Sequence, residues 1–253
     1  MAFAVAYSSE LGRHARGPEL TYTVSPECVG EQGVARRGAN VNRQTAAKSA
    51  PGRLRIVAGI WRSRLLDIAD VPGLRPTSER IRETVFNWLA PHIEGARCLD
   101  LFAGSGALGL EALSRGAREA VFVERSPVAA RVLRRNIAEL GAGNATVVTS
   151  DALAYLQSGS EGEFDIVFLD PPFAAGLLEE LCRLLHESGV LAAGASAVRA
   201  KVPRVKAGAK AARARVYLEQ DRDRPEPVLP DGWRLLKNKT AGRVRYMLAA
   251  PVS

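Results

Sequence analysis

The chain has 253 residues, of which 47% are hydrophobic, so it can bury a sizeable core as one large domain or two small ones. Its 35 Lys and Arg against 27 Asp and Glu give a formal net charge of +8, which favours polyanionic partners, nucleic acid first. No apolar run approaches the roughly 20 residues of a membrane-spanning helix.

The cysteines and histidines argue against a disulfide-bonded protein and against a metal-binding protein. Cys28, Cys98 and Cys182 lie far apart and form no C-x-x-C, so we expect reduced thiols and a cytoplasmic protein. Neither these cysteines nor the three histidines have metal-ligand spacing, and no metal is predicted. The opening "MAFAVAY" has no basic region before a long apolar run, so no signal peptide is expected.

The N-terminal part predicts an extension followed by a hairpin. Residues 1 to about 52 are rich in Gly, Ser, Ala, Asn and Gln without a lasting helical or strand period, which predicts a disordered segment. In "LRIVAGIWRSRLLDI", residues 54–68, two β-rich runs flank Gly59 and predict a β-hairpin. Four arginines decorate this hairpin: Arg53, Arg55, Arg62 and Arg64.

A helix is expected within "RPTSERIRETVFNWLAPHI", residues 75–93. Thr77 or Ser78 can cap it, with Glu79 in its first turn. Pro91 is expected to end it. Its apolar stripe consists of Ile81, Val85, Trp88 and Leu89.

From residue 97 onward, strand and helix patterns alternate, which predicts βαβ units and a mostly parallel sheet covered on both faces. The expected strands are 97–101, 119–124, 145–151 and 164–170, and the expected helices are 107–116, 126–141 and 176–189. Residues 215–220 and 243–250 are expected to close the sheet. Between residues 190 and 216 the chain holds seven basic residues and no acidic one, which predicts a flexible basic insertion.

The first strand leads into a glycine loop. Gly104, Gly106 and Gly109 in "LDLFAGSGALGLEAL" satisfy G-x-G-x-x-G between a strand and a helix, a pattern that lets a ligand approach the backbone. Glu124 ends the next strand, twenty residues after Gly104, where a carboxylate can accept hydrogen bonds from ribose hydroxyls.

Two cofactors fit this loop, a dinucleotide and S-adenosylmethionine, and three features favour the second. Asp100 ends the first strand, where an acid would repel a pyrophosphate but suits a cationic amino acid. Asp151 follows the third strand, where it can cap an adenine. The fourth strand ends in Asp-Pro-Pro-Phe, residues 170–173, which no dehydrogenase chemistry requires.

Asp-Pro-Pro-Phe suits methyl transfer to an exocyclic base amine. Such an amine is a poor nucleophile because its lone pair is conjugated into the ring, and hydrogen-bond acceptors on its N–H groups localise that lone pair. Asp170 supplies one acceptor and the carbonyl of Pro171 a second, held by the rigid pair with Pro172. Phe173 can stack on the base.

These motifs resemble the class I S-adenosylmethionine-dependent methyltransferases that act on exocyclic amines. More narrowly, "RIVAGIWRSRLL", "RPTSERIRETVFNWL", "CLDLFAGSGALGLEALSRGA", "VFVERSPVAARVLRRN" and "DIVFLDPPF" resemble the bacterial small-subunit rRNA guanine-N2 methyltransferase family of the methyltransferase D type. The resemblance covers about residues 53–190 and 216–249. The RPT block is its most specific part, whereas many methyltransferases share the glycine loop and DPPF.

The resemblance implies a seven-stranded, mostly parallel sheet with helices on both faces and an N-terminal basic β-hairpin. It implies three regions: an extension over 1–52, an RNA-binding hairpin and capping helix over 53–95, and a methyltransferase domain over 96–250 with the basic insertion at about 192–215. The implied reaction is methylation of guanine N2 in 16S rRNA, at guanine 966, by a cytoplasmic monomer acting on the assembled small subunit without a metal.

It also implies roles for individual residues. Asp170, Pro171, Pro172 and Phe173 would hold the guanine, while Arg75, Pro76 and Thr77 would close over the cofactor and shape the target pocket. The implied cofactor-binding residues are Asp100, Phe102, Gly104, Gly106, Glu124, Asp151 and Thr77. The implied rRNA-binding residues are Arg53, Arg55, Arg62, Arg64, Arg75 and Arg80.

Three other functions remain open at this point. A DNA amino-methyltransferase shares DPPF but normally needs a target-recognition domain, for which the basic insertion is small. An NAD-binding oxidoreductase shares the glycine loop, and a non-catalytic RNA-binding protein would not need residues 170–173. The N-terminal extension and the basic insertion are unusual for the family, so docking on the ribosomal substrate is expected to differ.

Deleting residues 199–215 tests the basic insertion. If its seven basic residues contact phosphates, the deletion weakens RNA binding and flattens its salt dependence, while cofactor affinity stays the same. The measurement is RNA affinity at several salt concentrations. An unchanged salt slope would mean that these charges only solvate a loop.

Overall fold

A computed structural model describes residues 52–159, 162–172, 176–192 and 214–252 of the chain. The predicted extension over 1–52 and the basic insertion at about 192–215 lie almost entirely outside these ranges, and so does Phe173. The predictions made for these segments therefore stay predictions.

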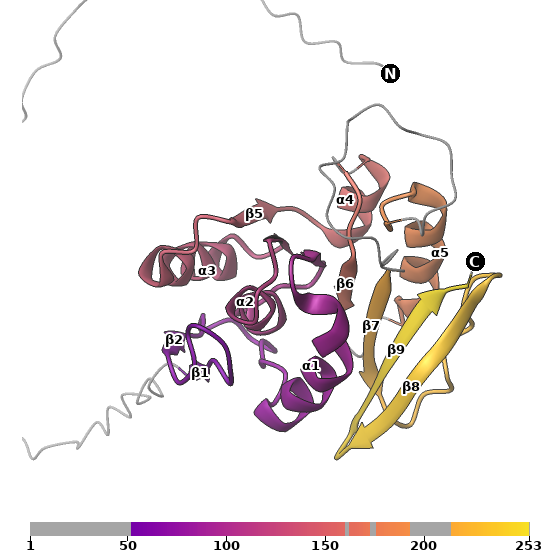
Figure 1. Cartoon of the computed structure of the whole chain (residues 1–253), viewed down its shortest axis with the longest axis horizontal. Helices are drawn as coiled ribbons and strands as arrows, with labels where there is room; N and C mark the ends of the chain where they lie inside the picture. Colours follow the sequence, from indigo (N-terminus) through magenta and orange to yellow (C-terminus); the bar gives the residue numbers. More distant parts are fainter. Residues whose placement is uncertain (1–51, 160–161, 173–175, 193–213, 253) are drawn as a thin grey trace, which may run out of the picture. The chain divides into compact units, whose positions relative to one another are not determined.

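A seven-stranded sheet forms the centre of the molecule, in the order β5-β4-β3-β6-β7-β9-β8 (Figure 1). The pairs β4–β5, β3–β4, β3–β6 and β6–β7 are parallel, and β9 pairs antiparallel with both β7 and β8. The predicted mostly parallel sheet is thereby confirmed. The strands are β3 (Arg97–Asp100), β4 (Glu119–Glu124), β5 (Ala145–Thr149), β6 (Ile166–Leu169), β7 (Arg215–Asp221), β8 (Trp233–Ala241) and β9 (Val244–Pro251).

Helices cover both faces of this sheet, each over its own hydrophobic cluster. On one face lie α1 (Glu79–Ile93), α2 (Ala107–Ser114) and α3 (Pro127–Leu140), with Phe86, Leu110 and Leu133 buried against the sheet. On the other lie α4 (Ala152–Gln157) and α5 (Leu178–Ser188), with Leu156 and Leu181 buried. Every residue of β6 is buried, as expected for a strand covered on two sides.

The predicted N-terminal hairpin forms a separate two-stranded antiparallel sheet of β1 (Arg53–Arg55) and β2 (Leu65–Asp67). Leu54 and Leu66 face each other in the register and are buried in the same cluster as α1 and α2. Arg53 and Arg55 alternate with Leu54 and point to solvent, because successive side chains of a strand take opposite faces.

Helix α1 corrects one prediction. It does not end at Pro91 but continues through it to Ile93, while Ser78 caps its start by accepting from the Ile81 N–H. A proline in the last turn removes only one intrahelical hydrogen bond, and burial of Ile93 in the core offsets that loss. Gly95, with a φ of 72°, then redirects the chain toward β3.

Two elements were not predicted, the six-residue helix α4 and the edge strand β8. The sheet ends at β8, which carries the exposed Lys237 and Lys239 and an irregularity in its pairing with β9 between Leu235 and Lys237. At the opposite edge, Arg134 of α3 donates to the Val147 carbonyl and the Thr149 hydroxyl of β5.

A buried ion pair joins the hairpin to the helices. Arg82 of α1 and Glu111 of α2 are 1% and 0% exposed, with Nη1 and Oε2 3.0 Å apart. Arg82 also donates to the carbonyls of Arg55 and Thr77. The remaining acceptor capacity of Glu111 is used by the backbone N–H groups of Val57 and Ala58 and by Arg115.

Replacing Arg82 with Met should therefore destabilise the protein, by up to about 3–5 kcal/mol, because the fully buried Glu111 would lose its buried cation and keep only the partly exposed Arg115. Urea unfolding followed by circular dichroism measures this. Arg183→Met is the matched control, since its ion pair with Glu187 is exposed and such pairs contribute at most about 1 kcal/mol. Equal losses in the two variants would contradict a special role for the buried pair.

Candidate active site

Four acidic side chains meet at the carboxyl edge of the sheet. Asp100 ends β3, Glu124 ends β4 and Asp170 directly follows β6. Glu219 lies beside Asp170 because Leu169 of β6 pairs with Leu218 of β7. Ligands of open parallel sheets bind at this edge, so the fold gathers three predicted site residues and one that was not predicted.

The glycine loop has a backbone conformation that only glycine adopts easily at two of its positions. Gly104 and Gly106 have φ angles of 51° and 81°, and Gly106 directly precedes α2. A Cβ on Gly106 would lie 2.5 Å from the Leu133 Cδ1. Glu124 holds the loop, because its two oxygens accept from the N–H groups of Gly104 at 2.8 Å and Ser126 at 2.7 Å.

Asp100 lies beneath this loop, 2% exposed, and accepts a hydrogen bond from the Gly109 N–H at 3.1 Å. Burial raises the pKa of Asp100 to about 7, and the nearby charge of Asp170 adds to the shift. A carboxyl group in this state gains stability from a cation placed beside it. The predicted role of Asp100, to lie beside a positively charged ligand, stays a prediction that this environment suits.

Asp170 joins the predicted RPT block to Asp-Pro-Pro-Phe. The Thr77 hydroxyl donates to the Asp170 Oδ2 at 3.0 Å, across 93 residues of sequence. Burial raises the pKa of Asp170 to about 6, although the Thr77 hydrogen bond opposes this. Pro171 is buried and Pro172 is exposed. Phe173 lies outside the described residues, so its stacking role stays a prediction.

Glu219 is the acidic residue that the sequence analysis missed. It is 4% exposed and accepts a 2.6 Å hydrogen bond from the Tyr217 hydroxyl. Burial raises the pKa of Glu219 to about 8, with the charge of Asp170 as the next cause. An acid within the otherwise buried run "VYLEQ" was the available signal.

The remaining predicted cofactor residues lie at the same edge of the sheet or near it. Asp151 is exposed and caps α4, its Oδ1 accepting from the N–H groups of Leu153 and Ala154. Phe102 is partly buried and packs against the α4–α5 cluster. The Asp151 side chain is therefore accessible to a ligand, although one of its oxygens already caps α4.

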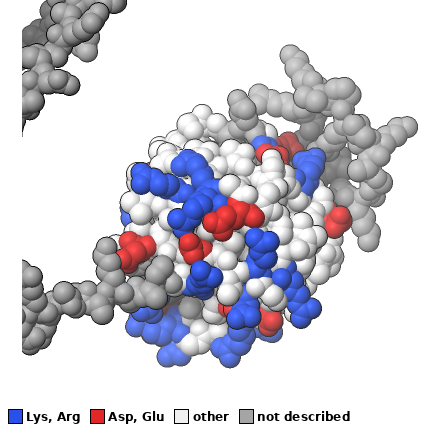
Figure 2. Space-filling model, turned by 90° about the vertical axis from the view of Figure 1, so that its left-hand side faces the viewer, with Lys and Arg blue, Asp and Glu red and all other residues white. Residues whose placement is uncertain are grey.

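The predicted rRNA-binding arginines are all exposed: Arg53, Arg55, Arg62, Arg64, Arg75 and Arg80. The face formed by the hairpin and α3 carries clustered basic side chains with a few acidic ones among them (Figure 2). Arg53 pairs with Asp67 at 3.8 Å and Arg55 with Glu79 at 3.6 Å. Such exposed pairs are weak, so these arginines can exchange partners.

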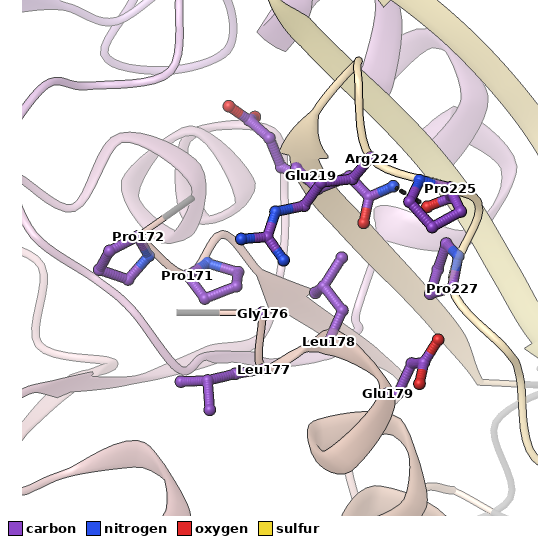
Figure 3. Close-up of a pocket in the computed structure, with 11 residues that line it drawn as sticks. Pro171, Pro172, Gly176, Leu177, Leu178, Glu179, Glu219, Arg224, Pro225 and Pro227 are labelled. Carbon is purple, nitrogen blue, oxygen red and sulfur yellow. Dashed lines mark hydrogen bonds between the residues drawn. The ribbon is translucent and has the colours of Figure 1, made fainter. Parts of the chain in front are cut away.

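A cavity opens beside the two prolines, between the end of β6, the start of α5 and the β7–β8 connection. The Arg224 side chain extends toward Pro171 in this cavity, whereas the Glu219 carboxylate turns away from it (Figure 3). The lining residues are Pro171, Pro172, Gly176, Leu177, Leu178, Glu179, Glu219, Gln220, Arg224, Pro225 and Pro227.

Two kinds of feature are absent from the described residues. No group of His, Cys, Asp and Glu there could hold a metal ion. No helix in the same ranges combines the length and apolar character needed to cross a membrane.

Comparisons with known proteins agree with this geometry. Residues 54–250 match the family model "Conserved hypothetical protein 95". The Ribosomal RNA small subunit methyltransferase D of Escherichia coli strain K12 is 46% identical over 201 residues, covering 79% of this chain and 91% of that protein. Its Haemophilus influenzae namesake is 40% identical over 203 residues, covering 79% and 95%. A solved Escherichia coli structure of the proposed methyltransferase yhhF has a TM-score of 0.67 and 42% identity, covering 79% and 99%.

The sheet order, the glycine loop and the acidic residues at the strand ends define a class I methyltransferase. The methyl donor of this class is S-adenosylmethionine, as the sequence predicted. The chain belongs to the family of the Ribosomal RNA small subunit methyltransferase D proteins.

The described residues fit this cofactor. Positive φ angles at Gly104 and Gly106 give the loop a tight turn that a side chain would disrupt, and Asp100, with a raised pKa, is buried at the end of the strand that leads into it. S-adenosylmethionine supplies an activated methyl group on a positively charged sulfur. Asp100, Glu124 and Asp170 provide the negative surroundings that a cation requires.

The affinity for S-adenosylmethionine should fall as the pH is lowered through about 7. Below that pH Asp100 is protonated in the free protein, and cation binding must first expel the proton, which weakens affinity by up to about tenfold per pH unit. Calorimetry between pH 5.5 and 8.5 measures this. Asp100→Asn should bind weakly and show a much flatter pH profile. A profile like that of the wild type would exclude Asp100 as the titrating group.

Proposed function

We propose that this protein transfers a methyl group from S-adenosylmethionine to the exocyclic N2 of a guanine in small-subunit rRNA. The observation that supports this most is the placement of Asp170, a half-buried acceptor fixed by Thr77 beside Pro171 at the edge where the glycine loop lies. An acceptor in that place is what a conjugated amine needs to become a nucleophile.

In the proposed pose, the target amine donates one N–H to Asp170 and the other to the Pro171 carbonyl. The N2 lone pair then forms the bond to the methyl carbon, and the electron pair of the breaking C–S bond returns to sulfur. N2 gives up one proton, which Asp170 accepts and passes to solvent. Positioning supplies most of the acceleration, since the donor is already activated.

The substrate class is supported by relatives and by surface charge. The family members named above are ribosomal RNA small subunit methyltransferases, and the exposed arginines of the hairpin offer phosphate contacts. Two backbone N–H groups of the hairpin segment donate hydrogen bonds to Glu111 of α2 and so hold the hairpin to this helix. The hairpin arginines therefore have a fixed position relative to the glycine loop. The resemblance points to guanine 966 of 16S rRNA within the assembled subunit.

The residue roles follow the same proposal. The methionine part of the cofactor contacts Asp100, Gly104, Gly106 and neighbouring Phe102, Glu124 binds the ribose, and Asp151 binds the adenine. The carboxylate oxygens of Glu124 and Asp151 already accept hydrogen bonds from backbone N–H groups. Each oxygen has a second lone pair, which would accept a hydrogen bond from the cofactor. Thr77 contacts Asp170 and would act on the cofactor side from there. The cytoplasmic location and monomeric state stay predictions.

One assay separates the substrates. The protein is incubated with tritiated S-adenosylmethionine and, in parallel, with free 16S rRNA, assembled small subunits or DNA, and the nucleosides are analysed. The expected product is N2-methylguanosine in rRNA, at a position mapped by primer extension. A methylated adenine or cytosine in DNA would establish a DNA amino-methyltransferase instead.

Asp170→Ala should lower the single-turnover methylation rate by about 10²–10³, because it removes an acceptor for the amine. Cofactor affinity should change little. Phe173→Ala should instead weaken RNA capture, by about 1–3 kcal/mol if the ring stacks on the base. Glu180→Ala, an exposed acid on α5, serves as the control. Wild-type rates in a folded Asp170→Ala protein would refute this chemistry.

A further inference from the structure

Asp170 does not stand alone at the end of β6. Because Leu169 pairs with Leu218 in the parallel register, Asp170 and Glu219 follow side by side at the carboxyl edge. Glu219 is 4% exposed and Asp170 is half-buried. The charge of Asp170 raises the pKa of Glu219, so the two carboxyl groups lie close enough to repel each other when both are ionised. One proton must therefore be shared between them.

The neighbours of the pair decide where that proton resides. The Thr77 hydroxyl donates to Asp170 and the Tyr217 hydroxyl donates to Glu219. A hydrogen bond between the two acids would lower the pKa of Asp170 and raise that of Glu219. With burial included, the pKa of Asp170 is about 6 and that of Glu219 about 8. These directions favour the arrangement in which Glu219 holds the shared proton and Asp170 is ionised.

The other titratable groups around the pair do not replace this proton. Tyr217 lies on β7 with Glu219, Tyr246 of β9 is opposite Glu219 in the register, and Asp100 of β3 adds negative charge near Asp170. The negative charge of Glu124 of β4 also raises the pKa of Asp100. Within the described ranges, no ion pair joins a Lys or Arg to either acid. A proton on Glu219 is what permits two acids to be buried together.

We propose that Glu219 is a positioning residue: its neutral carboxyl group donates a hydrogen bond to Asp170 and fixes the acceptor oxygens toward the target amine. This inference rests on the proposed role of Asp170 as that acceptor. The observed Thr77 hydroxyl donates to Asp170 from the segment before α1, the proposed Glu219 donor lies on β7, and the Tyr217 hydroxyl donates to Glu219. A neutral donor orients Asp170 without cancelling the negative charge that the amine requires.

The arrangement predicts a bell-shaped pH profile with a different group on each side. Below about pH 6, Asp170 is protonated and cannot accept, so the rate falls. Above about pH 8, Glu219 ionises, loses its donor function and repels Asp170, so the rate falls again. Only the second decline depends on Glu219 being an acid.

Glu219→Gln separates these limbs, since Gln has the same shape and can donate to Asp170 and accept from Tyr217 but cannot ionise. Single-turnover methylation of rRNA is measured from pH 5.5 to 9.5. The variant should keep a near-wild-type rate at pH 7 and the acidic limb but lose the alkaline decline. Glu219→Ala should be about tenfold to hundredfold slower at pH 7, because a hydrogen bond to a charged group is lost.

Glu226→Gln is the matched control, because it makes the same change in an exposed side chain of the β7–β8 connection. It should keep both limbs. An unchanged alkaline limb in Glu219→Gln, or a wild-type rate in a folded Glu219→Ala protein, would overturn the inference.

A second measurement needs no substrate. Carbon-13 NMR of glutamate side-chain carboxyl groups should show one group titrating near pH 8, and this signal should be absent in Glu219→Gln. If it is present but rRNA is not methylated at guanine, the proposed function fails while the proton assignment stands. If no glutamate titrates in this range, the positioning role itself is refuted.

Discussion

The ion pair between Arg82 and Glu111 is the interaction on which the other parts of the site depend. Its two members bind the backbone of β1 and of the segment that directly follows it, Arg82 also binds the Thr77 carbonyl, and Glu111 belongs to the helix that starts at the glycine loop. Thr77 then reaches Asp170. A chain of hydrogen bonds thus leads from the hairpin to Asp170, with no buried side-chain N or O atom left unpaired among the described residues.

Charge is separated between the inside and the outside of the molecule. Asp100 and Glu219 are buried at the carboxyl edge with raised pKa values, whereas the arginines of the hairpin and Arg80 of α1 face solvent. A cationic cofactor and a polyanionic RNA make opposite electrostatic demands, and this separation meets both. The burial of the acids is stabilised by hydroxyl and backbone donors instead of by cations, so their charge remains available to a ligand.

The sequence predicts most of this fold because periodicity and turn residues agree along the central strands and helices. β4 has the predicted bounds, and α3 begins at Pro127 and ends before Gly141 as expected. The misses have physical reasons: α4 has only six residues, and β8 is rich in polar residues because one of its edges faces solvent.

Long-range polar contacts are harder to predict. Arg82 and Glu219 belong to residue types that are normally exposed. The burial of Arg82 depends on Glu111, 29 residues away in the sequence. The burial of Glu219 depends on Asp170, its neighbour across the β6–β7 pairing. Sequence patterns locate such residues on elements but do not identify these partners. Asp100, Glu124 and Asp170 were found because each follows a recognisable strand.

The two outer strands have a consequence for self-association. An open sheet exposes unpaired backbone groups on its first and last strands, which are templates for aggregation. Here the pairing irregularity near Leu236 distorts β8, and Lys237 and Lys239 place like charges along it. On the far side, Arg134 occupies acceptors of β5. Strand addition from another chain is thereby opposed at both borders, which lowers the risk of aggregation at the high local concentrations found during synthesis.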